Sequence, residues 1–171
     1  RRDISIADAI FGPDVGSLKG KTVQQGAIRV ETSLTNIPAH IMTHYRDIVL
    51  CGNIMFVNKI PFFMTVSRHI KFGPAEILKN QQNKTILAAI KQVKSVYAKR
   101  GFKIRHMLMD GQFESLRADL ADLHINLNTV SVDEHVPEIE RRIRTVKERT
   151  RCIYNTLPFR QIPPRMLIEM V

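Results

Sequence analysis

The chain has 171 residues, of which 44% are apolar and 25% charged, so it can bury one hydrophobic core without disulfides or a structural metal. Its two cysteines form no Cys-x-x-Cys pair, and no apolar run approaches the roughly 18 residues of a transmembrane span, which argues against a disulfide scaffold and a membrane protein. The net charge of +10 favours nucleic acid as a partner, although ribosomal and merely soluble basic proteins share this balance.

The first 44 residues are interrupted by glycine and proline and predict a linker that precedes the folded core. The core is expected to cover residues 45–171. Because the chain starts at Arg1 and not at Met, we expect a fragment of a longer polyprotein.

A nearly continuous apolar run at residues 48–57 predicts a central strand that is covered on both faces. Asn53 is the polar side chain in its interior. The pair Asn58-Lys59 predicts a two-residue hairpin turn into a second strand at residues 61–67. An edge strand is expected near residues 70–77.

The second half of the core alternates helices with strands. A helix begins near residue 83, with Asn83 as its predicted cap, and ends before Gly101. Strict alternation then predicts a strand at residues 102–110 with Asp110 at its carboxyl end. The remaining expected elements are a short helix at residues 113–122, a strand at residues 125–130 and a long helix at residues 136–155. This order predicts an α/β domain with a mixed five-stranded sheet flanked by helices, as in ribonuclease-H-like proteins.

Three blocks of sequence resemble the integrase catalytic core of copia-type long-terminal-repeat retrotransposons. They are residues 53–67 (NIMFVNKIPFFMTVS), residues 107–113 (MLMDGQF) and residues 140–149 (ERRIRTVKER). Residues 10–15 and 19–22 also resemble the segment that precedes such cores. The resemblance implies a DDE site on a ribonuclease-H-like fold.

The resemblance also implies the catalytic residues. Asp110, and Glu140 after 29 intervening residues, match the last two acids of the DDE set and would hold Mg²⁺ or Mn²⁺. Asn53 stands where related sequences carry the first Asp. An amide supplies no negative charge and its nitrogen cannot bridge a second ion, so we expect impaired metal binding and leave enzymatic activity open.

Each of these residues also has a purely structural interpretation. Asn53 can be a buried amide that is satisfied by backbone groups of a central strand. Asp110 can cap the turn at Gly111, and Glu140 can pair with Arg144 one helical turn further on. Glu138 competes for the role of the last acid, but its displacement by two positions directs it to another side of the helix.

The last predicted helix is rich in cations, and we expect it to bind DNA through Arg141, Arg144, Lys147 and Arg151. A solvated charged face is the alternative. The function that the resemblance implies is 3′ processing and strand transfer on DNA, both element ends and target, by a homo-oligomer in the nucleus and in cytoplasmic retrotransposon particles. The rival hypothesis is a non-catalytic DNA-binding or oligomerising module with the same fold.

Overall fold

The computed structural model describes residues 6, 9–10, 12, 36–130, 136–158 and 161–171. Most of the predicted linker, including residues 19–22, lies outside these ranges. One compact unit extends over Ile37–Val171. This unit includes α3 (Ala39–Tyr45), a helix that the sequence did not predict. The helix belongs to the unit because its residues Ile41 and Met42 pack against the core.

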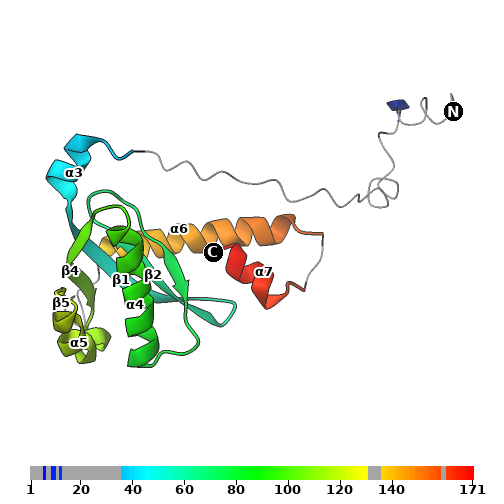
Figure 1. Ribbon diagram of the computed structural model, residues 1–171. Coiled ribbons are helices and arrows are strands. Elements are labelled where there is room, and N and C mark those ends of the chain that lie inside the picture. The colour runs from blue at the N-terminus through cyan, green and yellow to red at the C-terminus, as the bar shows by residue number, and fades with distance from the viewer. Residues whose placement is uncertain (1–5, 7–8, 11, 13–35, 131–135, 159–160) are drawn as a thin grey trace. The chain divides into compact units, whose positions relative to one another are not determined.

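A mixed five-stranded sheet with the order β3-β2-β1-β4-β5 forms the centre of this unit, which confirms the predicted architecture (Figure 1). The strands are β1 (Asp47–Val57), β2 (Ile60–Ser67), β3 (Ala75–Ile77), β4 (Lys103–Asp110) and β5 (Asn126–Val130). The first three pair antiparallel, whereas β4 pairs parallel with both β1 and β5. Strand β1 therefore lies in the middle, as its apolar sequence predicts.

The predicted hairpin between β1 and β2 is present. Asn58 and Lys59 have φ angles of 48° and 66°, the positive values that a type I′ turn requires at both positions. Asn tolerates such a φ, whereas Lys adopts it against the preference of its side chain.

One face of the sheet is covered by α4 (Asn83–Ala98), which buries Ile86, Ile90 and Val93 in the larger hydrophobic cluster. The predicted cap at Asn83 is wrong. Gln82 occupies the cap position without a side-chain hydrogen bond, and the Asn83 amide instead donates to the Ser115 hydroxyl at 3.0 Å.

The other face is covered by α6 (Pro137–Thr156), so α4 and α6 form separate layers on the two sides of the sheet (Figure 1). Ile139 of α6 is fully buried in a second cluster with Cys51 and Met55 of β1. Two further helical segments, η1 (Gly111–Leu116) and α5 (Arg117–Asp122), form the predicted short helix after β4. A helix that the sequence did not predict, α7 (Pro164–Glu169), buries Leu167.

A bulge interrupts β4. The pairing of β1 with β4 shifts between Ile48 and Val49, and Arg105 is the extra residue. Ile104 therefore packs in the α4 cluster, whereas Leu108 packs in the α6 cluster, so the strict alternation expected over residues 102–110 is interrupted. Asp110, two positions after Leu108, lies on the α6 side.

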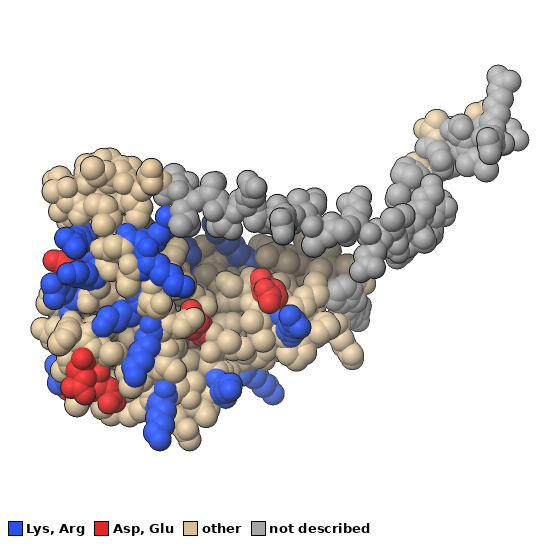
Figure 2. Space-filling view, in the orientation of Figure 1, with Lys and Arg blue, Asp and Glu red and all other residues tan. Residues whose placement is uncertain are grey.

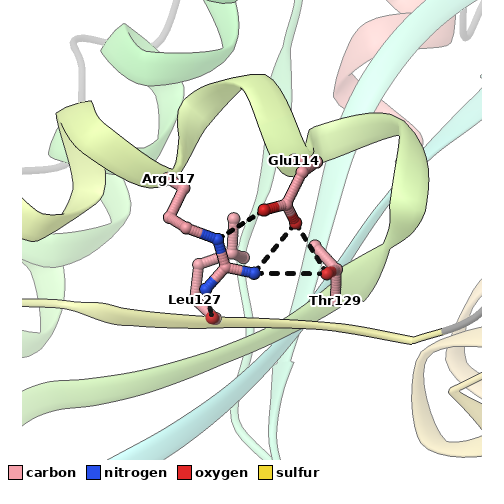
Figure 3. A network of polar contacts seen from close by, with 4 residues as sticks. All are labelled: Glu114, Arg117, Leu127 and Thr129. Atoms are coloured by element: carbon pink, nitrogen blue, oxygen red, sulfur yellow. Dashed lines mark hydrogen bonds and ion pairs between the residues drawn. The ribbon is translucent and has the colours of Figure 1, made fainter.

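Strand β5 forms one margin of the sheet and is held by a polar network from η1 and α5 (Figure 3). The Arg117 guanidinium donates to the Leu127 backbone carbonyl at 2.8 Å and pairs with the Glu114 carboxylate. Hydrogen bonds from Arg117 and then from the Thr129 hydroxyl lower the pKa of Glu114 to about 2. The Glu114 carboxylate is therefore ionised at neutral pH.

Basic side chains are spread over the face that carries α4, with few acidic ones among them (Figure 2). No helix within the described ranges has the length and apolar character needed to cross a membrane.

Candidate functional site

Asn53 and Asp110 lie side by side where two central strands separate. The ladder between β1 and β4 ends at the pair Cys51 and Leu108, and both residues follow two positions later on the same face. Each side chain is half-buried. The two catalytic positions expected on different strands are thus brought into direct contact.

The Asn53 amide is hydrogen-bonded at both ends. Its Nδ2 donates to Asp110 Oδ2 at 2.8 Å, and its Oδ1 accepts from the Ile54 backbone N–H at 2.7 Å. The Gln112 amide also donates to Asn53 Oδ1, at 3.4 Å. Because the Ile54 N–H can only donate, the amide oxygen must face it, and the amide nitrogen must face Asp110.

This network decides between the structural alternatives for the two residues. Asp110 precedes η1 but makes no side-chain capping bond, so the capping interpretation is wrong. Asn53 does satisfy a backbone group, as expected of a buried strand amide, but its other end binds the Asp110 carboxylate. Gln112 was missed from the sequence, although it lies only two residues after Asp110 in the same block.

Glu140 lies in the first turn of α6 and is exposed. Its competitor Glu138 accepts a hydrogen bond from Arg68 Nε at 2.8 Å, and Arg68 follows the end of β2 on the side of β1 away from β4. Two residues turn an α-helix by about 200°. Glu138 and Glu140 therefore occupy opposite flanks of α6, and the Glu140 flank faces β4.

The direction of α6 across the sheet follows from what lies near its two ends. Burial, and then the nearby Glu138 carboxylate, raises the pKa of the Cys51 thiol to about 11, while Thr150 shares a surface hollow with Val57. Twelve helical residues rise about 18 Å, close to the roughly 20 Å of the strand between Cys51 and Val57. The helix thus runs along β1, and Ile139 near its start lies in one hydrophobic cluster with Cys51 and Met55.

The native side chains do not fit a two-ion centre. The described residues contain no group of three His, Cys, Asp or Glu side chains that could hold a metal ion. The Asn53 oxygen already accepts two hydrogen bonds, and the Asn53 nitrogen occupies the space beside Asp110 where a cation would sit. A cation would have to displace this N–H and would meet a neutral ligand in return.

The predicted DNA-binding cations divide between the two flanks of α6. Arg144, Lys147 and Arg151 recur at intervals of three or four residues after Glu140 and lie on its flank. Arg141 instead lines a hollow together with Glu138. The Arg151 side chain also folds back, with its Nε donating to the Lys147 backbone carbonyl at 3.2 Å.

Comparison with solved structures identifies the fold. The HTLV-2 integrase catalytic core domain in complex with magnesium matches in its dimeric form with a TM-score of 0.52 and in its trimeric form with 0.53, each at 16% identity, and each match covers 71% of this chain and 79% of that one. The catalytic core domain of BIV integrase matches with a TM-score of 0.51 at 14% identity, over 71% of this chain and 78% of that one. The chain has the ribonuclease-H-like fold of a retroviral integrase catalytic core. No protein-family model and no curated protein matches the sequence.

Proposed function

We propose that the chain is an integrase-type core that binds DNA and in which metal-dependent chemistry is disabled at Asn53. The observation that carries this proposal is the hydrogen bond from Asn53 to Asp110 across the end of the β1–β4 ladder, in a domain with an integrase-core fold. The three blocks of sequence resemblance support a copia-type retrotransposon polyprotein as its source.

In this proposal Asp110 and Glu140 are the surviving metal ligands, and Asn53 occupies the position of the first acid. The resemblance implies that intact relatives use Mg²⁺ or Mn²⁺ for 3′ processing and strand transfer. With an amide in place of the first acid the site loses one negative charge and one bridging ligand, so its affinity for the ions is weakened.

DNA is the proposed partner because cations follow Glu140 along one flank of α6. Arg144, Lys147 and Arg151 share this flank, so phosphates held by them would lie on the same side of α6 as Glu140. Arg141 would contact DNA from the other flank. The proposed protein acts as a homo-oligomer on element ends and target DNA, in the nucleus and in retrotransposon particles.

The chemistry is tested by Mn²⁺-dependent strand cleavage and joining on a branched DNA substrate. We compare the native chain, Asn53→Asp, and Asn53→Asp combined with Glu140→Gln. Activity that is absent from the native chain, present with Asn53→Asp and lost with Glu140→Gln is the expected result. Equal activity of the native chain and Asn53→Asp would contradict the assignment of Asn53 as the disabling residue.

DNA binding is tested separately by its dependence on salt. Lys147→Glu with Arg151→Glu should weaken binding and reduce the slope of log K against log salt by up to about 2, because each lost phosphate contact removes about one released counterion. Lys84→Glu with Lys91→Glu, on exposed positions of α4, makes the same charge change on the other side of the sheet. An equal effect of both pairs would assign the α6 cations to general electrostatic attraction.

The rival proposal is a module that keeps the fold and binds DNA or oligomerises without chemistry. It is favoured by the Asn53 network, which satisfies the Asp110 carboxylate without any cation. Titration with Mg²⁺ discriminates the two proposals. If neither the native chain nor Asn53→Asp binds the ion, no latent site exists and the non-catalytic module is the better description.

A further inference from the structure

A small cationic hollow lies on the flank of α6 opposite Glu140. Its volume is about 180 Å³. It is lined by Val66, Lys71, Glu138, Arg141, Arg142 and Thr145. Lys71 lies in the turn after β2, so the hollow is formed between this turn and the first turns of α6 and is separate from the Asn53–Asp110 pair.

Positive charge dominates this hollow. Its lining includes three cations, Lys71, Arg141 and Arg142, and one carboxylate, Glu138. The Glu138 carboxylate is already paired through Oε1 with Arg68 Nε at 2.8 Å. The ion pair offsets the single negative charge, so the three lining cations favour an anionic occupant.

Two polar atoms of the lining residues are buried, with almost no surface open to solvent, and lack hydrogen-bond partners among the described residues. One is a donor, Arg142 Nε, and the other is an acceptor, Glu138 Oε2. Leaving such buried atoms unpaired is unfavourable, because each has lost its hydrogen bonds to water without gaining others. Once the Arg142 and Glu138 side chains turn toward the hollow, an occupant that both accepts and donates would satisfy the two atoms together.

We propose that this hollow binds a phosphate monoester group or inorganic phosphate. An unprotonated phosphate oxygen would accept from Arg142 Nε, and the cations of Lys71 and Arg141 would balance its charge. Inorganic phosphate keeps at least one P–OH at neutral pH, and a monoester carries one below its second pKa of about 6, so each can donate to Glu138 Oε2 in that protonation state. A phosphodiester or a sulfate has no such proton and would leave the acceptor unpaired.

The size of the hollow supports a single phosphate group. Its volume of about 180 Å³ equals about six water molecules at roughly 30 Å³ each. Pockets for organic ligands are usually about 300–1,000 Å³, so a whole nucleotide would not be enclosed. The group could come from free phosphate or from the 5′ end of a nucleic acid strand.

The test is calorimetric titration of the native chain with inorganic phosphate and with sulfate at matched ionic strength. We expect phosphate to bind about tenfold more tightly than sulfate, the effect of one hydrogen bond to a charged group. Lys71→Gln with Arg142→Gln should weaken phosphate binding at least about tenfold. Lys84→Gln with Lys91→Gln on α4 is the matched control and should leave binding unchanged.

Two further variants test the site if the double variant does not fold and test the role of Glu138. Lys71→Gln alone changes only an exposed turn residue and serves if the double variant does not fold. Glu138→Gln should abolish the preference for phosphate over sulfate. Absence of saturable phosphate binding, or equal binding by the native chain and both Lys71 variants, would overturn the site, and equal affinity for phosphate and sulfate would overturn the role of Glu138.

The source of the phosphate is separated by a second arm with short oligonucleotides. A preference for the 5′-phosphorylated strand over the unphosphorylated strand, lost in the hollow variants, would assign the hollow to strand ends. Binding of inorganic phosphate without such a preference would assign it to free phosphate. The inorganic phosphate titration contains no DNA, so its result does not depend on whether the α6 cations bind DNA.

Discussion

Replacing Asn53 by Asp should exchange a stabilising contact for a repulsive one. The native Asn53 nitrogen donates to Asp110 Oδ2 at 2.8 Å, whereas an Asp at this position would place a second carboxylate beside the first. Two charges about 4 Å apart repel by about 1 kcal/mol in water and about 4 kcal/mol at the effective dielectric constant of a protein surface. Both side chains are half-buried, so we expect a loss of about 1–4 kcal/mol in the free energy of unfolding.

The assay is thermal unfolding in EDTA and in Mg²⁺ or Mn²⁺. For a domain of this length 1 kcal/mol corresponds to about 2–4 °C, so Asn53→Asp should lower the melting temperature in EDTA by about 2–16 °C. The divalent ion should reverse this loss, since a ligand at 100 times its dissociation constant stabilises by about 2.7 kcal/mol. The native chain should show a much smaller response to the ion.

Asn53→Ala is the control, because it removes the hydrogen bond without adding a charge and should gain no response to metal. Equal melting temperatures of the native chain and Asn53→Asp in EDTA would refute the proposed contact between the two positions. Stabilisation of the native chain by Mg²⁺ as large as that of Asn53→Asp would refute the idea that the amide obstructs the ion.

Three other predictions address the fold. Because the pKa of Glu114 is lowered to about 2, the stability that its pair with Arg117 contributes should be complete above about pH 4.5 and lost as the pH falls through about 2. The free energies of unfolding of the native chain and Glu114→Gln, measured by denaturant titration, should therefore converge at low pH. A difference that stays constant with pH would contradict this. Burial raises the pKa of Cys51 to about 11, so a thiol reagent at neutral pH should label the exposed Cys152 of the folded chain, and mass spectrometry should find Cys51 modified only after unfolding. Ile139→Ala should lower the free energy of unfolding by about 2–5 kcal/mol in chemical denaturation, because Ile139 is fully buried on the side of α6 that faces the sheet. A loss below about 1 kcal/mol would indicate that α6 is loosely packed.

The main elements could be predicted because their sequences carry strong local signals. The apolar run of β1, the Asn58-Lys59 turn and the stripe of α4 each determine their structure within about 20 residues, and all are present. The bulge at Arg105 could not be predicted, because apolar residues on both sides of β4 fit either an alternating or a shifted strand. The short helices α3 and α7 carry too few residues for a periodic pattern.

The candidate site shows the same division between local and distant information. The sequence resemblance selected Asn53 and Asp110 as candidate positions, and their contact joins residues 57 positions apart. The orientation of the amide depends on where the β1–β4 ladder ends, which no local pattern encodes. The pairing of Glu138 with Arg68 was also invisible, although the helical offset from Glu140 correctly separated the two acids.

The guanidinium of Arg117 has a consequence for how copies of the molecule could associate. A strand from a second molecule that approached β5 would have to compete with Arg117 for the Leu127 carbonyl. The opposite margin, β3, offers only three residues for pairing. Both margins thus resist the continuous extension that drives fibril formation, and we expect any assembly of this core to use its helices or loops as the contact surface.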